Sequence, residues 1–167
     1  MRRWPYLLIS LAVLALDQAT KGWILATIPE GQDHPVTSWF MLTHWRNPGS
    51  LFGFLSNIPP KAALAVFLVL PLAGMAFLAY LFVKSQRPVE LALLAAVLGG
   101  AAGNLVDRLR FGAVVDFLYF HVPGGPGWPS FNVADACLST GIVLLLVLTL
   151  IHPPPEGGHA PRSVLHR

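Results

Sequence analysis

Long apolar runs alternate with shorter polar stretches along the chain, and this pattern predicts four membrane-spanning helices. The runs cover residues 4–28, 62–83, 89–106 and 132–151. A helix of about 20 apolar residues crosses the hydrocarbon core of a bilayer. Pro71 and Gly74 lie within the second run, where a membrane helix tolerates them because neighbouring groups satisfy the freed backbone. The predicted fold class is therefore a membrane all-α protein with four transmembrane helices.

Two polar stretches between these runs have the composition of surface segments. Residues 29–61 contain prolines and charged side chains, and residues 111–129 lie in a region rich in glycine and proline. Within the first stretch, residues 36–45 predict one or two short strands, whose aromatic side chains suit the headgroup layer of a membrane. Residues 51–55 are apolar again, and we expect them to return toward the lipid.

The composition supports a membrane protein. Hydrophobic residues make up 54% of the chain and charged residues only 11%, whereas a soluble domain carries about 25% charged residues. The chain has no basic run interleaved with aromatic residues, so nothing in the sequence indicates nucleic-acid binding. Cys137 is the only cysteine, which excludes an intrachain disulfide and a cysteine-based zinc site.

The placement of basic residues predicts the orientation in the membrane. Arg2 and Arg3 precede the first run, and Lys84 and Arg87 lie in the loop between the second and third runs. Basic residues collect on the cytoplasmic side, so both termini are predicted to be cytoplasmic. We expect one integral membrane domain over residues 1–152 and a disordered cytoplasmic tail over the rest, residues 153–167.

Two aspartates lie at the ends of apolar runs, on the side of the membrane that is predicted to face outward. Asp116 follows the third run and Asp135 lies in the first turn of the fourth. Two neighbouring carboxylates do not both ionise easily, so one keeps a proton and the pair supplies a general acid and a general base. Such a pair can activate water for attack on an amide carbonyl. Alternatively, the two residues separately cap helices or pair with Arg108 and Arg110.

Other polar residues have the spacing of a shared helix face. Asn104 and Arg108 are four positions apart, and Asn132 and Asp135 are three apart. These side chains can support a site at the ends of the helices. They can equally make ordinary hydrogen bonds between helices, or extend to the membrane interface.

Asp17 and Lys21 interrupt the first apolar run. They are four positions apart, so they can form an ion pair on one helix face. We interpret this pair as a structural link to a neighbouring helix rather than as a catalytic pair. The same residues interrupt the place where a secretory signal peptide would be cleaved, which favours a transmembrane helix over a signal peptide.

Other chemistries have weaker support in the sequence. It has no HExxH zinc motif. No residue at a suitable spacing can serve as the base that would activate Ser50 as a nucleophile. Cys137 is interpreted as a thiol packed in the interior. Two non-enzymatic classes remain as alternatives. One is a small transporter whose intramembrane aspartates carry protons or cations, and the other is a lipid-binding scaffold.

Five motifs together resemble the lipoprotein signal peptidases, also called signal peptidase II. In chain order these are DQATK (17–21), RNPGSLFGF (46–54), GNLVDR (103–108), VVDF (114–117) and FNVADA (131–136). The resemblance implies an aspartyl endopeptidase of the bacterial inner membrane, with a small β-cradle on the outer side. It implies cleavage of diacylglyceryl-modified prolipoproteins before the lipidated cysteine, without a metal or cofactor. It also implies inhibition by the cyclic peptide globomycin, and we expect a monomer.

The same resemblance assigns roles to individual residues. It implies that Asp116 and Asp135 are the catalytic pair. The residues expected to bind substrate or support the site are Asn47, Gly103, Asn104, Arg108, Asn132 and Ala134. Those expected to give structural support are Asp17, Lys21 and Asp107.

Overall fold

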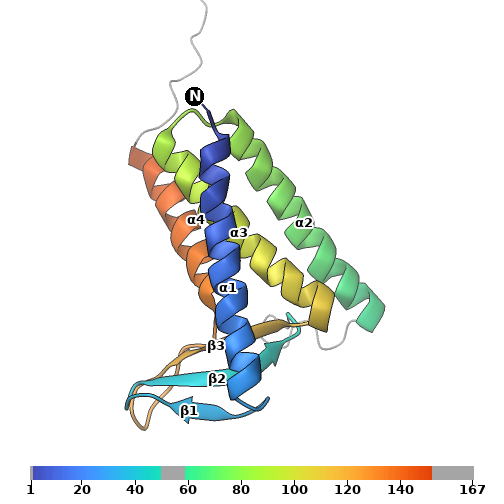
Figure 1. Cartoon of the computed structure of the whole chain (residues 1–167), viewed down its shortest axis with the longest axis vertical. Coiled ribbons are helices and arrows are strands. Elements are labelled where there is room, and N and C mark those ends of the chain that lie inside the picture. The colour runs from blue at the N-terminus through green and yellow to red at the C-terminus, as the bar shows by residue number, and fades with distance from the viewer. Residues whose placement is uncertain (1, 50–58, 152–167) are drawn as a thin grey trace, which may run out of the picture.

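The computed structural model describes residues 2–49 and 59–151, which form a bundle of helices above a small sheet (Figure 1). The helical elements are η1 (Trp4–Tyr6), α1 (Leu7–Thr27), α2 (Pro60–Lys84), α3 (Pro88–Phe111) and α4 (Val133–Ile151). The strands are β1 (Asp33–Pro35), β2 (Phe40–Asn47) and β3 (Val114–Phe120). Four helical segments are long and apolar enough to cross a membrane, in agreement with the number predicted.

The ends of α3 determine where the chain enters the sheet. Pro88 begins the helix, where its missing N–H costs no hydrogen bond. Gly112 ends it with a φ of 70°, a left-handed conformation that glycine adopts without steric cost, and its N–H donates to the carbonyl of Arg108 (3.0 Å). This sharp end sends the chain directly into β3 and so places Asp116 beside the helix ends.

Helix α3 lies at the centre of the bundle. In Figure 1 it crosses behind α1, with α2 and α4 on either side, and it packs against all three of these helices. Helix α2 packs mainly against α3, which leaves a groove of about 650 Å³ between α2 and α4. Apolar side chains such as Phe77, Leu94 and Leu145 line this groove, and Lys84 and Glu90 lie at its polar end.

The sheet lies at the end of the bundle opposite the N-terminus (Figure 1). Its strand order is β1-β2-β3 and both pairings are antiparallel, with an irregularity in β2 between Leu42 and Trp45. The end of α1 holds the sheet in place, because Ile24 and Ile28 form a buried apolar cluster with two residues of β3, Val115 and Phe117. Burial of such side chains is the main favourable term in packing the sheet against the helix.

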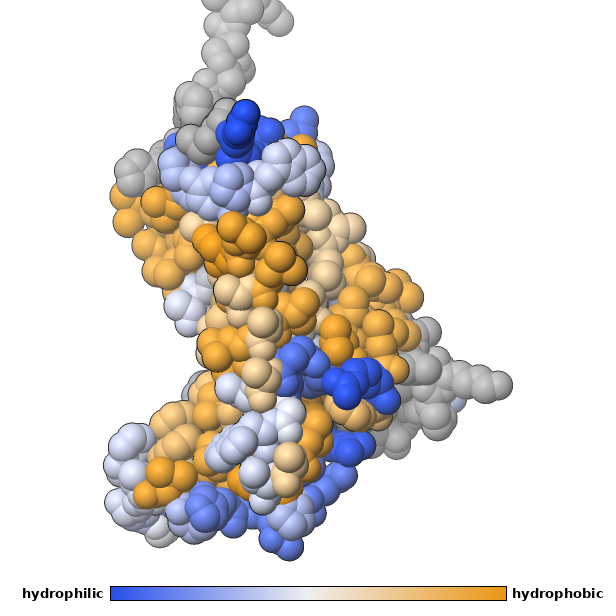
Figure 2. Space-filling model, in the orientation of Figure 1, coloured by the Kyte–Doolittle hydropathy of each residue, from blue (hydrophilic) through white to orange (hydrophobic). Residues whose placement is uncertain are grey.

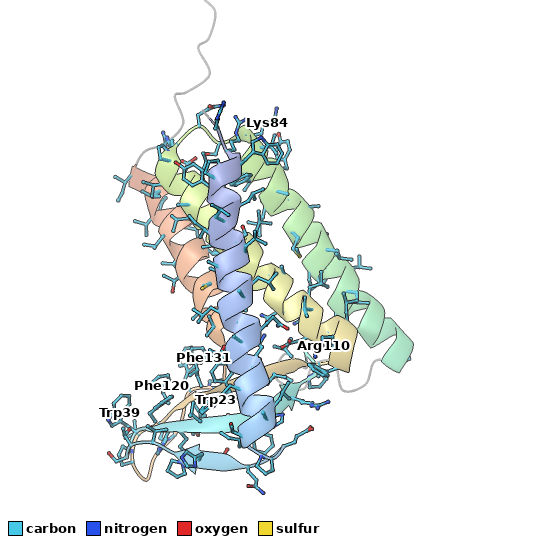
Figure 3. The ribbon with its side chains drawn as sticks, viewed as in Figure 1. Trp23, Trp39, Lys84, Arg110, Phe120 and Phe131 are labelled. Atoms are coloured by element: carbon cyan, nitrogen blue, oxygen red, sulfur yellow. The ribbon has the colours of Figure 1, made fainter. Side chains whose placement is uncertain are left out.

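Aromatic side chains gather at the end of the sheet where β2 begins and β3 ends. The rings of Phe40 and Phe120 stack with centroids 4.8 Å apart, and Trp39 and Phe131 stack on Phe120 (Figure 3). Figure 2 shows a hydrophobic surface over the middle of the helices and hydrophilic patches at the N-terminal end and over the sheet. This distribution is typical of a membrane protein with its aromatic residues near the interface.

Several predicted boundaries differ from the structure. Helix α3 continues past residue 106 to Phe111, because Asp107 does not end the helix: its side chain is buried, where it binds Lys21 and the N–H of Val115. The predicted strand region 36–45 was only partly right, since a bend separates β1 from β2 there. Strand β3 was not predicted. The apolar segment 51–55 and the tail 153–167 lie outside the described residues.

Candidate active site

The two aspartates singled out in the sequence meet where β3 passes the first turn of α4. Asp116 lies in β3 with 3% of its surface exposed, and Asp135 is half-buried in α4. Both carboxylates bind Asn132. The side-chain amide of Asn132 donates to Oδ1 of Asp116 (2.8 Å), and its backbone N–H donates to Oδ2 of Asp135 (3.3 Å). One residue therefore holds the two acids next to each other.

Asn132 also caps helix α4. Its Oδ1 accepts the backbone N–H of Asp135 (2.9 Å), while the carboxylate of Asp135 accepts the N–H of Asn132 in return. This reciprocal arrangement is a capping box, which satisfies N–H groups that the first turn of a helix leaves unpaired. Asp135 thus does cap its helix, as the alternative interpretation held, and the same contacts fix its carboxylate beside Asp116.

Two further asparagines bind the aspartates. Asn47 at the end of β2 donates to Oδ2 of Asp116 (3.1 Å), and Asn104 in α3 donates to Oδ1 of Asp135 (2.7 Å). The oxygen of Asn104 in turn accepts the amide of Asn132 (3.2 Å). Each carboxylate therefore receives neutral amide donors from more than one element, which fixes its orientation without supplying a full opposite charge.

This environment changes the acidity of Asp116. Burial raises its pKa to about 6, and the nearby carboxylate of Asp135 contributes to the rise. The hydrogen bonds from Asn47 and Asn132 oppose the rise, because they stabilise the ionised form. A carboxyl group that titrates near neutral pH can exchange a proton during catalysis.

Among the described residues, the arginines near the site do not form the ion pairs with Asp116 or Asp135 that the alternative interpretation allowed. Arg108 donates from Nη1 to the carbonyl of Asn104 (3.3 Å), and Arg110 lies over the ring of Phe111, 4.9 Å from its centroid. Within residues 2–49 and 59–151, neither guanidinium makes a salt bridge to Asp116 or Asp135. The Nε of Arg108 is buried without a hydrogen-bond partner in this part of the chain.

A buried ion triad, formed by Asp17, Lys21 and Asp107, lies behind the two aspartates. Lys21 Nζ lies 2.9 Å from Oδ2 of Asp17 and 2.8 Å from Oδ2 of Asp107. The ion pair between Asp17 and Lys21 that the spacing predicted is present, and Asp107 of α3 joins it. All three side chains are almost completely buried, so none of the charges is shared with solvent.

The carboxylates of the triad also bind backbone groups. Asp17 Oδ1 accepts the N–H of Ala134 (2.9 Å), and Asp107 Oδ2 accepts the N–H of Val115 (3.1 Å). Gly103 lies against the Asp17 carboxylate, where an added Cβ would collide with Oδ2. Gly103 and Ala134, which the resemblance assigned to the site, thus contact Asp17 of the triad.

Sequence reasoning missed Gln18. Its Nε2 donates to Oδ1 of Asp107 (3.0 Å) and to the carbonyl of Gly103 (3.2 Å), so it links α1 to α3 beside the triad. The available signal was a polar side chain next to Asp17 in an otherwise apolar run.

Among the residues that the structure describes, no group of three or more His, Cys, Asp or Glu side chains could hold a metal ion. Ser50 lies outside the described residues.

Comparison with known proteins gives a consistent result. The family model described as "Signal peptidase (SPase) II" matches residues 9–151. The lipoprotein signal peptidase of Moorella thermoacetica is 40% identical over 158 residues, covering 94% of this chain and 99% of that protein. That of Azoarcus sp. is also 40% identical, over 161 residues, covering 94% of this chain and 90% of that protein.

Solved structures agree with the sequence comparisons. One structure of a bacterial membrane enzyme is similar with a TM-score of 0.78 and 28% identity, covering 92% of both chains. A second has a TM-score of 0.76 and 30% identity, covering 87% of this chain and 92% of that one. The chain described here is therefore a multi-pass membrane protein that belongs to the signal peptidase II family.

Proposed function

We propose that Asp116 and Asp135 are the catalytic pair with which this signal peptidase cleaves the signal peptide from diacylglyceryl-modified prolipoproteins. The observation that carries the proposal is the binding of both carboxylates by Asn132, at the point where β3 meets the start of α4. Membership of the family supports the prolipoprotein as substrate. The transporter alternative has no support from the comparisons.

The chemistry proceeds by attack of water on the amide carbonyl that precedes the lipidated cysteine. The ionised carboxylate of the pair takes a proton from water, and the resulting oxygen nucleophile attacks the carbonyl carbon. The protonated carboxyl donates a hydrogen bond to the carbonyl oxygen. Collapse of the tetrahedral intermediate breaks the C–N bond, and a proton from the pair passes to the departing amine. No metal or organic cofactor takes part in these steps.

Arg108 is suited to bind the substrate near the pair. Its Nε has no partner among the described residues, and a buried donor without a partner is costly. A carbonyl oxygen of the substrate peptide or of its diacylglyceryl group would satisfy this donor. The side chains of Asn47 and Asn104 then orient the acids, while Arg108 holds the substrate.

The membrane concentrates and positions the substrate. The lipid on the cysteine anchors the substrate in the bilayer, so binding energy from the lipid and the signal helix can orient the scissile bond. With the basic residues placed on the cytoplasmic side, the termini are cytoplasmic and the sheet lies outside the inner membrane. The pair then faces the outer leaflet. We expect globomycin to compete at this site, and we expect the enzyme to act as a monomer.

Cleavage of a lipid-modified prolipoprotein peptide by the purified protein tests this proposal. Asp116→Asn and Asp135→Asn should each bind the peptide and lose cleavage by at least about 1,000-fold, because each removes an acid or base from the reaction. Asp33→Asn serves as the matched control, because Asp33 lies on the sheet and contacts Trp45 rather than the pair. Near-normal cleavage by either pair variant would show that the assignment is wrong.

A further inference from the structure

The triad contacts the chain immediately before each of the two aspartates. Asp17 binds the N–H of Ala134, the residue before Asp135. Asp107 binds the N–H of Val115, the residue before Asp116. The two anchoring carboxylates come from different helices, and the ammonium of Lys21 joins them. A single side chain thereby links the backbone positions of both members of the pair.

Lys21 also sets the orientation of a side chain that touches the pair. Its ammonium has three N–H donors and no acceptor, and its third contact is with Oδ1 of Asn104 (3.0 Å). An ammonium can bind only the oxygen end of an amide, so the NH₂ end of Asn104 must point away from Lys21. That end donates to Asp135 (2.7 Å). The second donor to the oxygen of Asn104 is Asn132, which supports the same orientation.

We propose that Lys21 is a positioning residue for the reaction, acting through Asp17, Asp107 and Asn104 on the two aspartates. This inference rests on the proposed function of Asp116 and Asp135. It goes beyond a structural ion pair between helices, because an ion pair that only joined α1 to α3 would not fix the atoms next to both acids. With 1% of its surface exposed, Lys21 has no route to the substrate, so it acts only through its neighbours.

Loss of Lys21 should change catalysis in the folded enzyme. Without the ammonium, the carboxylates of Asp17 and Asp107 repel each other and Asn104 can turn its oxygen toward Asp135. A displacement of reacting groups by about 1 Å can cost about 100-fold in rate. We therefore expect kcat to fall about 100-fold in Lys21→Met while KM stays nearly unchanged, because the substrate contacts are not altered.

The pH profile gives a readout that a purely structural role would not change. The pair consists of Asp116 of β3 and Asp135 of α4. The other charged groups at the site are Asp17 and Lys21 of α1 and Asp107 and Arg108 of α3. The positive charge of Lys21 lowers the pKa of Asp116. Its removal should therefore move the acidic limb of the kcat profile to higher pH.

The experiment compares folded, monodisperse wild type and variants on the same lipid-modified peptide. Because Lys21→Met leaves two buried carboxylates unpaired, a second variant combines it with Asp107→Asn. This double variant keeps the net charge of the triad and keeps an amide oxygen for the N–H of Val115, but it lacks the ammonium. The expected result is the same loss of kcat with little change in KM.

Ser10→Ala is the matched control. Ser10 Oγ donates to the carbonyl of Ala95 (2.6 Å), which ties the same two helices together far from the pair. It should lower thermal stability without changing kcat or the pH profile. Wild-type kcat and pH profile in either folded Lys21 variant would overturn the positioning role. If wild type itself fails to cleave, the proposed function fails, whereas active wild type with active Lys21 variants contradicts only this inference.

Discussion

At the scale of residues, the site holds two acids with amides rather than with cations. A guanidinium bonded to a carboxylate strongly stabilises the ionised form and keeps its pKa low. The amides of Asn47, Asn104 and Asn132 orient the carboxylates with a weaker effect on ionisation. Burial can then raise the pKa of Asp116 to about 6, and the two carboxyl groups can share one proton near neutral pH.

This environment predicts the pH dependence of cleavage. As pH falls through about 6, Asp116 takes up a proton and the pair loses its ionised member, so kcat should fall toward acid pH. Asn47→Leu removes a hydrogen bond that lowers the pKa of Asp116, and the acidic limb should therefore move to higher pH. The measurement is kcat against pH with saturating lipid-modified peptide.

Thr149→Val is a suitable control, because Thr149 Oγ1 donates to the carbonyl of Leu145 within α4 (2.9 Å), far from the pair. Its profile should overlay that of wild type. An acidic limb near pH 4 in the wild type would contradict the raised pKa of Asp116. A limb in Asn47→Leu that coincides with that of wild type would show that Asn47 does not act on Asp116.

At this scale the sequence predicted contacts within one helix better than contacts between elements. Spacing of four residues in one helix was enough to pair Asp17 with Lys21. The resemblance gave Asp107 a supporting role, but its contact with Lys21 could not be predicted, because that contact depends on the relative position of α1 and α3. For the same reason, nothing in the sequence indicated that the N–H groups of Ala134 and Val115 bind the triad.

At the scale of elements, small residues allow α3 to approach its neighbours closely. An added Cβ on Gly100 would lie 2.7 Å from the carbonyl oxygen of Ala134, in the first turn of α4. A Cβ on Gly99 would lie 2.5 Å from the carbonyl oxygen of Ser10 in α1. Both neighbours are backbone atoms, so neither can move aside without shifting a helix. Close approach at small residues is a common feature of packing between membrane helices.

Gly100→Ala should therefore displace the start of α4 and with it Asp135. We expect kcat to fall about 10- to 100-fold, because small displacements of reacting groups are costly, and we expect lower thermal stability. Gly22→Ala in α1 is the matched control, since nothing lies within 4 Å of its added Cβ. It should leave kcat unchanged. Equal kcat in the two variants would mean that the α3–α4 contact does not position Asp135.

The helices could be predicted from the sequence more completely than the sheet. Four long apolar runs are a strong signal, and all four helices are present. The first polar stretch contains β-favouring residues, but the strands begin and end at positions set by pairing between distant segments. Strand β3 follows α3 after only a short turn, and its pairing with β2 cannot be inferred from local composition.

At the scale of the whole molecule, the hydrophobic belt in Figure 2 separates the N-terminal end from the sheet. The loop after α2 and the sheet therefore face opposite sides of the membrane. The basic residues near the N-terminus and in this loop predict that the loop lies on the cytoplasmic side of the membrane. The sheet is then predicted to lie on the outer side.

Cysteine labelling of intact cells tests this orientation. In a Cys137→Ser background, Gln32→Cys lies beside the sheet and Gln86→Cys lies in the loop between α2 and α3, and both side chains are exposed. A membrane-impermeant maleimide should label the first variant in intact cells and the second only after the cells are opened. The reverse pattern would place the active site on the cytoplasmic side and contradict the proposed topology.

The open packing of α2 also affects how freely different parts of this chain can change during evolution. From Val66 to Lys84, most of α2 faces outward or toward its groove with α4, whereas α3 has neighbours on three sides. Outward positions of α2 need only remain apolar, so many substitutions there should be neutral. Positions of α3 must fit several partners at once, and a change in one usually requires a compensating change in another. Related enzymes should therefore diverge fastest along α2 and slowest along α3.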